Sequence, residues 1–221
     1  CHWQVGRDRV VMAQPAALQL SEADSRALLA AMAPFFAEDG LTLEWLAPLR
    51  WRAGGKVFAD LACASLDRAG GATVDDWLPR AQEARTVRRL QQEMQMLLYT
   101  HPVNTEREAR GLAPVNSFWV EGAGALPADL SDTAAAPQGD ERLRAPALAQ
   151  DWPAWAAAWQ QLDAQVLAPL AQASDRGESI QLTLCGEKSA QTWASAPTGW
   201  RQRLLRALRP APAAAQALAA L

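Results

Sequence analysis

The sequence predicts an α+β protein (α/β-like), in which a mixed β-sheet of about four to six strands is covered by about four helices. Two patterns carry this prediction. Apolar residues alternate with polar ones in several short segments, which is typical of half-buried strands, and they recur at three- and four-residue steps in longer segments, which is typical of helices. The predicted order is hairpin, helix, strand, long helix, strand, helix, strand and helix.

Residues 2–12 are expected to form a β-hairpin, because apolar and polar residues alternate on both sides of a Gly-Arg-Asp turn. A helix then begins at Ser21, whose hydroxyl is suited to capping, and it stops at Gly40. Pro34 is expected to kink or end this helix. The alternation over residues 41–45 predicts a half-buried strand.

The longest helical pattern covers residues 79–99 and ends at Thr100-His101-Pro102, because the residue before a proline is disfavoured in helical geometry. Residues 115–120 are predicted to form a short strand. The apolar stripe of the long helix consists of Ala84, Val87, Leu90, Met94, Leu97 and Leu98.

The remainder of the chain begins with a linker or mobile loop at 125–139, which is rich in Ala, Pro, Asp and Ser. A helix capped by Asp151, a strand over 180–184 and a basic helix over 200–209 follow, and the tail 210–221 is expected to fray. The helical spacing of Trp152, Trp155 and Trp159 indicates a core-facing stripe, with a stacking platform as the alternative.

Composition limits the functional classes. The chain has 221 residues, half of them apolar, and a net charge of -3, so it resembles an ordinary globular protein and gives no global attraction to nucleic acid or anionic membranes. Its three cysteines lack a CxxC spacing, which argues against a disulfide framework or a zinc site and indicates a reducing, cytoplasmic compartment. No apolar run is long enough to span a membrane.

Common catalytic motifs are absent from the sequence. It contains no GxxxxGK[ST] phosphate loop, no GxGxxG and no GxSxG nucleophile elbow. His2 and His101 are the only histidines, and a two-metal phosphate centre needs several clustered Asp and His ligands. We therefore expect no catalytic residue, metal site or cofactor in this chain.

One polar cluster remains as a candidate site, at the end of the long helix and in the strand after it. Amides at these positions are suited to binding a small phosphorylated or carboxylate ligand, an imidazole can donate or titrate, and a serine near it is a weak nucleophile. The alternative is that these side chains only satisfy free backbone groups at helix and strand ends. The candidate residues are His101, Asn104, Asn116, Ser117 and Trp119.

Four segments, Cys1–Gly6, Glu93–Asn104, Pro114–Trp119 and Leu182–Glu187, resemble the RpfE-type regulatory protein family of proteobacteria. The resemblance extends over most of the chain, and members of that family are often labelled phosphoglycerate mutase. Members are longer at the N-terminus, which agrees with a chain that begins at Cys1 rather than Met, so an N-terminally truncated chain is expected.

Residues 1–53, a hairpin, a helix and a strand that ends in Pro48-Leu49-Arg50-Trp51, are similar to the subdomain inserted in archaeal-type cofactor-independent phosphoglycerate mutases. The resemblance implies a subdomain at 1–53 and a main body at 54–209. In those mutases the metal ligands and the phospho-acceptor serine belong to another domain, and none of them matches a position here.

Three functional hypotheses follow. The leading one is a non-catalytic regulatory or ligand-binding protein of the RpfE type, with ligand and protein partner unknown. The alternative is a metal-dependent phosphoglycerate mutase-like enzyme or phosphohydrolase whose catalytic ligands lie outside this chain. The third is a nucleic-acid accessory protein that uses the arginine-rich helices, against which the net charge argues.

Overall fold

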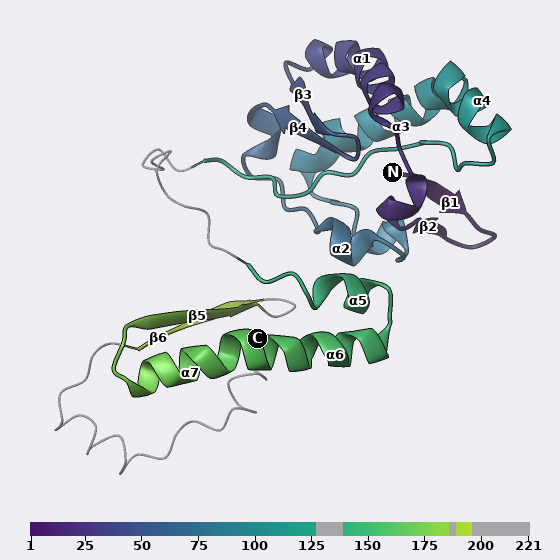
Figure 1. Cartoon of the computed structure of the whole chain (residues 1–221). Coiled ribbons are helices and arrows are strands. Elements are labelled where there is room, and N and C mark those ends of the chain that lie inside the picture. The colour runs from purple at the N-terminus through teal and green to yellow at the C-terminus, as the bar shows by residue number, and fades with distance from the viewer. Residues whose placement is uncertain (127–138, 186–188, 196–221) are drawn as a thin grey trace. The chain divides into compact units, whose positions relative to one another are not determined.

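The computed structural model describes residues 1–126, 139–185 and 189–195, and the chain divides into two compact units, Cys1–Ala135 and Ala136–Leu221 (Figure 1). Both units contain helices and antiparallel hairpins, which confirms the α+β prediction. The mixed sheet of about four to six strands is wrong, because the described strands form three separate two-stranded sheets. Alternation shows that a strand is half-buried but does not show which strands are neighbours. The division at residue 53 stays a prediction.

The first unit contains four short strands and four α-helices in its described residues. Short 3-10 turns at Pro15–Leu18, Lys56–Phe58, Val74–Asp76 and Gln82–Ala84 connect the main elements. Those elements are β1 (Trp3–Val5), β2 (Val10–Met12), α1 (Glu22–Glu38), β3 (Thr42–Ala47), β4 (Arg50–Gly54), α2 (Leu66–Ala69), α3 (Arg85–Tyr99) and α4 (Pro102–Ala109).

Helix α1 begins and ends as its sequence predicts. The Ser21 hydroxyl accepts a hydrogen bond from the backbone N–H of Asp24 at 3.1 Å, which satisfies one of the free donors of the first turn. Gly40, just past the helix, has a φ of 69°, a left-handed conformation that glycine adopts without strain. Pro34 lies inside α1, so it does not end the helix, and the alternative of a kink stays a prediction.

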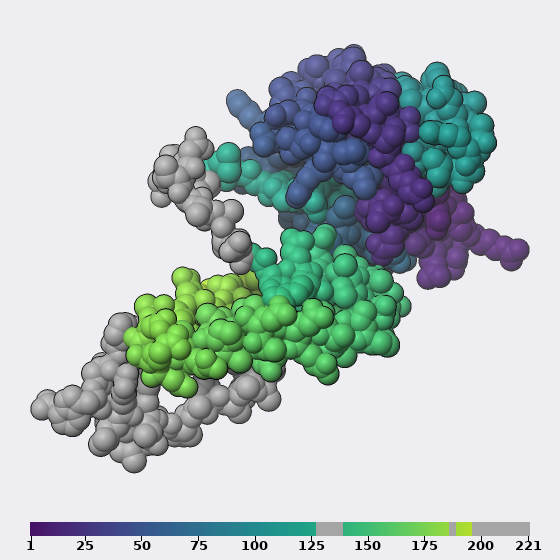
Figure 2. Space-filling model, in the orientation of Figure 1, coloured from purple at the N-terminus to yellow at the C-terminus, as the bar shows by residue number. Residues whose placement is uncertain are grey.

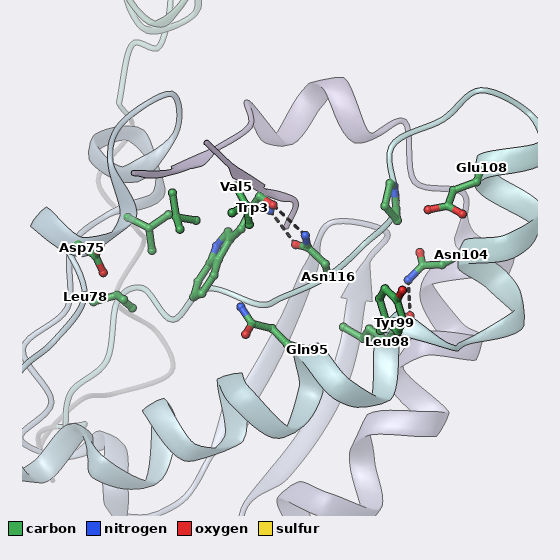
Figure 3. Close-up of a pocket in the computed structure, with 13 residues that line it drawn as sticks. Trp3, Val5, Asp75, Leu78, Gln95, Leu98, Tyr99, Asn104, Glu108 and Asn116 are labelled. Carbon is green, nitrogen blue, oxygen red and sulfur yellow. Dashed lines mark hydrogen bonds between the residues drawn. The ribbon is translucent and has the colours of Figure 1, made fainter. Parts of the chain in front are cut away.

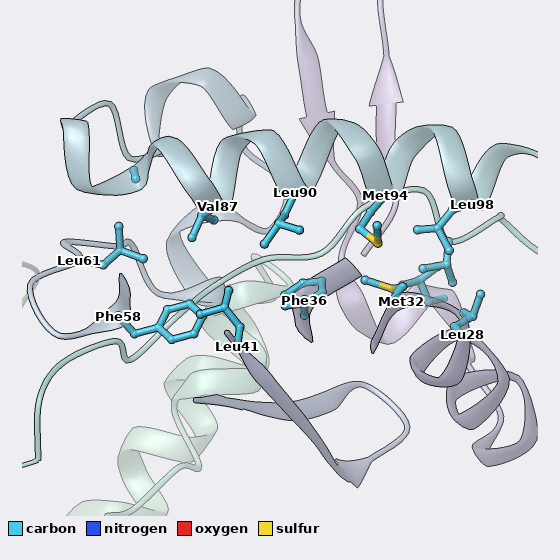
Figure 4. Close-up of a cluster of buried hydrophobic side chains, with 13 residues drawn as sticks. Leu28, Met32, Phe36, Leu41, Phe58, Leu61, Val87, Leu90, Met94 and Leu98 are labelled. Atoms are coloured by element: carbon cyan, nitrogen blue, oxygen red, sulfur yellow. The ribbon is translucent and has the colours of Figure 1, made fainter. Parts of the chain in front are cut away.

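The core of the first unit lies between α1, α3 and the β3–β4 hairpin. Figure 4 shows Val87, Leu90, Met94 and Leu98 pointing from α3 toward side chains of α1 and the residue that precedes β3. This is the predicted apolar stripe of the long helix, and all four residues are buried. The cluster also contains Leu18, Leu28, Met32, Phe36, Leu41, Phe58, Leu61, Ala84 and Val115.

A single buried hydroxyl attaches the β3–β4 hairpin to α1. Trp45 and Trp51 are opposite each other across the two strands. Their indole N–H groups both donate to the Ser25 hydroxyl, at 3.1 Å and 2.9 Å. Ser25 is fully buried. A polar residue in the core is tolerated here because it satisfies two donors that would otherwise lose their hydrogen bonds on burial.

Helix α4 is absent from the sequence prediction. Pro102 does end α3, but it also occupies the first turn of α4, where a missing N–H costs nothing. The imidazole of His101 caps this new helix. On α4, the fully buried guanidinium of Arg107 donates to the carbonyl of Ala113 at 3.0 Å and 2.9 Å and to the carbonyl of Leu18.

Residues 115–120 are extended but form no strand, which corrects the prediction for this segment. The backbone N–H groups of Asn116 and Ser117 both donate to the carbonyl of Cys1, at 3.2 Å and 3.3 Å, so the bonds converge instead of forming a ladder. The Cys1 amine donates to the Ser117 carbonyl at 2.8 Å, and His2 Nδ1 donates to the Pro114 carbonyl at 2.8 Å. We call this contact of residues 1–3 with residues 114–117 the N-terminal pairing.

In its described residues, the second unit consists of three helices, a π-helical turn and one hairpin. The predicted strand at 180–184 is confirmed, while its partner was not predicted, and the expected helix at 200–209 and the tail 210–221 lie outside the described residues. The elements are α5 (Arg144–Leu148), α6 (Trp152–Leu162), the turn Asp163–Leu167, α7 (Ala168–Asp175), β5 (Ile180–Cys185) and β6 (Ala190–Ser195).

The tryptophan stripe of α6 differs from its prediction. Trp152 and Trp159 are 60% and 36% exposed, and Trp155 stacks edge to face against both. The three rings therefore cover one another more than they enter a core. Among the helices that the structure describes, none is both long and apolar enough to cross a bilayer.

We expect Ser25→Ala to destabilise the first unit by about 2 kcal/mol, because it leaves two indole N–H groups without an acceptor. Chemical unfolding followed by tryptophan fluorescence measures this change. The control is Ser65→Ala, since the exposed Ser65 precedes α2 without capping it through its side chain. Equal stability of the two variants would contradict the role assigned to Ser25.

The folding stability of this 221-residue polypeptide is expected to depend on pH through its terminal amine. Burial, assisted by the charge of Arg107, lowers the pKa of the Cys1 amine to about 5. The unfolded chain then binds a proton more readily than the folded one, so stability is full above about pH 8 and falls as the pH drops toward about 5. We expect a loss on the order of 2 kcal/mol between about pH 8.5 and about pH 6, measured by urea unfolding.

A short Gly-Ser extension before Cys1 is the control for this pH dependence. It replaces the amine by an amide N–H, which donates to Ser117 in the same way but does not titrate. The extended chain is expected to lose less stability over the same pH interval. An identical pH profile for both chains would show that the Cys1 amine is not the titrating group.

Candidate functional site

His101 caps helix α4 in the structure. Its Nδ1 accepts a hydrogen bond from the backbone N–H of Val103 at 3.2 Å, which caps α4. No hydrogen bond joins His101 to Ser117 among the described residues, and His101 lines neither of the two cavities described below. The helix-capping alternative therefore describes His101.

Both polar atoms of the Asn104 side-chain amide form hydrogen bonds with backbone groups. Its nitrogen donates to the carbonyls of Leu98 and Val115, at 2.8 Å and 2.7 Å, and its oxygen accepts from the Val115 N–H at 2.8 Å. Asn104 is buried, so these bonds are shielded from water. Its side chain thus ties the end of α3 to the start of the extended segment 115–120.

Asn116 performs the same task for the N-terminus. Its oxygen accepts from the Trp3 N–H at 2.7 Å, and its nitrogen donates to the Trp3 carbonyl at 2.8 Å. An amide side chain thereby replaces one residue pair of a β-ladder. The two amides that the sequence offered as ligand contacts are mainly engaged in these backbone bonds.

Ser117 and Trp119 face away from Asn116. Ser117 is 1% exposed, and its hydroxyl makes only a long 3.5 Å contact with the Phe118 carbonyl. The Trp119 indole N–H donates to the Ala64 carbonyl at 2.9 Å. Neither arrangement supplies a base that could activate the serine, so the geometry gives Ser117 no nucleophilic role.

The N-terminal pairing lies between two cavities of similar size. The first cavity, of about 740 Å³, is lined by Trp3 and Asn116, whereas the second, of about 730 Å³, is lined by Cys1 and Ser117. Within 114–117, Pro114 and Asn116 line the first cavity and Val115 and Ser117 line the second, so alternate residues of this segment face different cavities. The predicted site residues are divided accordingly: Asn104 and Asn116 line the first cavity, and Ser117 and Trp119 line the second.

The second cavity is mostly apolar. Its floor is formed by core residues of α1, including Leu28, Met32 and Phe36. Its charged lining residues are Arg50 and Glu121, which are 3.9 Å apart. Since Glu121 also accepts from the Leu66 N–H at 2.8 Å, the charges at this cavity already have partners.

The first cavity combines apolar walls with several polar groups from different elements. Figure 3 shows the Trp3 ring between Asp75 and Leu78 on one side and Gln95 and Asn116 on the other, with Tyr99, Asn104 and Glu108 further along. The lining residues are Trp3, Val5, Val10, Val74, Asp75, Leu78, Gln95, Leu98, Tyr99, Asn104, Glu108, Pro114 and Asn116.

One residue that lines the first cavity carries a buried donor without a partner. Trp3 is 8% exposed, and its indole N–H makes no hydrogen bond within the part of the chain that the structure describes. A buried donor without an acceptor costs about 1 to 3 kcal/mol, and native structures contain few of them. The nitrogen atom is itself buried from solvent, so this N–H does not contact the open volume of the first cavity.

The electrostatic character of the first cavity is acidic. Asp75 and Glu108 are exposed lining residues, and no Arg, Lys or His is part of the lining. Over residues 1–126, 139–185 and 189–195, no group of His, Cys, Asp and Glu is arranged to hold a metal ion. The lining therefore presents carboxylates and amides between apolar walls, without a clustered set of metal ligands among the described residues.

The sequence alone does not single out the lining residues of the first cavity. Trp3 falls within the predicted hairpin and Gln95 within the predicted long helix, and no function is predicted for them or for Asp75, Tyr99 and Glu108. A signal for Trp3 was available, since a hairpin tryptophan facing a core must find a partner for its N–H. No local signal connects residues 3, 75, 95 and 108, because only the fold brings them together.

The chain is similar over part of its length to phosphoglycerate mutases. It is 35% identical over 72 residues, 33% of the chain, to the 2,3-bisphosphoglycerate-independent phosphoglycerate mutase of Methanothrix thermoacetophila, of which this covers 18%. It is 33% identical over 75 residues to the corresponding enzyme of Methanosarcina mazei, of which this covers 19%. The match thus spans about a fifth of these curated relatives. No family model matches the chain, and no solved structure matches it significantly.

Proposed function

We propose that this protein is a non-catalytic, cytoplasmic regulatory protein of the bacterial RpfE type, and that it binds a small molecule in the first cavity. The observation that carries the proposal is a cavity with mostly apolar walls, in whose lining the half-buried amide of Gln95 makes no hydrogen bond within the described residues. A volume of about 740 Å³ is in the range of small-molecule sites.

The surrounding residues support binding more than catalysis. Ligand sites usually have apolar walls with a few polar groups that orient the ligand, and here Val74, Leu78 and Leu98 supply walls. Gln95 is half-buried in the lining and makes no hydrogen bond within the described residues, so its amide is available to a ligand. The described residues of the chain present no metal cluster beside it.

A thermal-shift screen with phosphorylated metabolites, nucleotides, carboxylates and amino-acid derivatives tests this proposal. We expect at least one compound to raise the melting temperature, because a ligand that binds only the folded state stabilises it. Gln95→Ala should weaken that compound by about threefold or more, through loss of a ligand hydrogen bond.

Gln92→Ala is the matched control, since Gln92 lies on the same helix, is exposed and does not line the first cavity. It should leave the affinity unchanged. The proposal fails if no compound in the screen stabilises the wild-type protein, or if Gln95→Ala and Gln92→Ala bind equally well.

The second candidate function is a metal-dependent phosphoglycerate mutase-like enzyme whose catalytic ligands lie outside this chain. The partial similarity to the archaeal mutases favours it. We expect this chain alone to show no interconversion of 2- and 3-phosphoglycerate with Mn²⁺ or Zn²⁺, because no metal ligand set is present in its described residues. Turnover that a chelator abolishes would replace the leading proposal with this second one.

A further inference from the structure

We propose that the second cavity is a docking groove for an extended peptide, which adds as a β-strand beside residues 118–121 and in which apolar residues alternate with acidic ones. This groove is separate from the first cavity, so the inference goes beyond the proposed small-molecule function and does not depend on it. Its support comes from the unpaired backbone of residues 118–124, the position of the groove along that backbone, and the charge of Arg50.

Residues 118–121 have the composition of a strand but no partner strand. Phe118, Trp119 and Val120 belong to the residue types that are enriched in strands, and all three are half-buried. From residue 118 to residue 124 no backbone N–H donates a hydrogen bond within the described residues. Among the carbonyls of this stretch only that of Phe118 accepts, from Gln91 at 3.2 Å and from Ser117 at 3.5 Å. Backbone groups away from solvent are rarely left unpaired, so an added strand would supply the missing partners.

The groove follows the backbone of this segment rather than one face of it. Every residue from 118 to 124 lines the second cavity, whereas in 114–117 only every second residue does. Side chains alternate between the two faces of an extended segment, so a cavity that contacts all of them lies along the edge, where the N–H and C=O groups point. Gly122 has a φ of 62°, which bends the chain and limits the extended part to residues up to 121.

The opposite wall of the groove comes from the β3–β4 hairpin and is apolar. Leu43 and Trp51 are half-buried lining residues of this hairpin, and Leu49 is 47% exposed at its tip. A cavity of about 730 Å³ has room for several side chains of one peptide. In strand addition the main chain gives affinity and every second side chain enters a pocket, so this wall favours apolar residues at alternate positions.

An extended peptide fits these observations better than a small apolar molecule or a second copy of this chain. A small apolar molecule would cover the free backbone groups without bonding them, which costs free energy. A second copy would have to offer its own residues 118–121, but Phe118 packs edge to face against Phe36, with ring centroids 5.3 Å apart. The Trp119 indole also donates to the Ala64 carbonyl, so neither side chain is free to fill a groove in a partner.

The charge at the groove favours acidic residues in the peptide. The Arg50 side chain is 74% exposed, and its guanidinium makes no hydrogen bond within the described residues. Its ion-pair partner Glu121 is 3.9 Å away, too far for a hydrogen bond, and Glu121 also accepts from the Leu66 N–H at 2.8 Å. A carboxylate of the peptide can therefore bind Arg50 with hydrogen bonds that Glu121 does not make.

The experiment uses capped octapeptides in which Glu alternates with Val, Leu or Phe, and their binding to the full 221-residue chain is measured by calorimetry. The control peptides have the same composition, but the four apolar residues precede the four Glu residues. We expect at least one alternating peptide to bind about tenfold more tightly than its control, because only alternation places the apolar side chains in the groove.

Methylation of peptide nitrogens tests the backbone pairing without changing the protein. A strand that adds to one edge uses every second N–H, so two versions of the tightest peptide are methylated at the two alternate sets of nitrogens. One version should bind about tenfold more weakly and the other should bind like the parent. Equal affinities of the two methylated versions would overturn strand addition.

Two pairs of variants locate the peptide on the protein. Leu49→Asp should weaken the tightest peptide by about fivefold or more, whereas Leu46→Asp, exposed in the same hairpin but outside the lining, should not. Arg50→Gln should weaken it by about threefold, an effect that salt reduces, while Arg52→Gln, on the same strand but outside the lining, should leave the affinity unchanged. Melting temperatures without peptide check that the variants are folded.

The inference is overturned if no alternating peptide binds, or if Leu49→Asp and Leu46→Asp bind the tightest peptide equally well. Small-molecule binding in the first cavity is a separate measurement. Either proposal can therefore fail while the other holds.

Discussion

The hydrogen bonds of the N-terminal pairing connect residues that are more than a hundred positions apart in the chain. Asn116 and Trp3 are separated by 113 positions, and they are joined by two bonds to one amide side chain. Closing so long a loop costs entropy, and that cost must be offset by contacts elsewhere in the unit. The buried guanidinium of Arg107 and the core between α1 and α3 supply such contacts on both sides of the pairing.

Both cavities depend on this pairing, because it forms the wall between them. In an extended segment neighbouring side chains point in opposite directions, so Asn116 and Ser117 necessarily face different sides. The tip of the β1–β2 hairpin projects from the first unit (Figure 2), while the base of the hairpin contributes Trp3 to the first cavity. An extended segment held by side-chain amides thus determines which groups line each cavity.

The distribution of satisfied and unsatisfied polar groups gives the first cavity its chemical character. The polar residues that the sequence makes conspicuous are mostly engaged in holding the backbone. The lining groups without a described hydrogen-bond partner are less conspicuous in the sequence, and they include the amide of Gln95 and the carboxylates of Asp75 and Glu108. A scaffold with rigid helices beneath irregular segments is a common arrangement for binding sites, because loops can vary while the core is kept.

The sequence by itself determined the local elements. It predicted the β1–β2 hairpin, the cap of α1 at Ser21 and the buried face of α3, because alternation, capping and helical spacing act over a few residues. It also located the polar cluster around His101 and Asn116. Only the tertiary structure decided that the strands stay in separate pairs and that Asn104 and Asn116 hold the backbone. It also decided that Trp3, Asp75, Gln95 and Glu108 line one cavity, since contacts between distant segments depend on packing that no local pattern encodes.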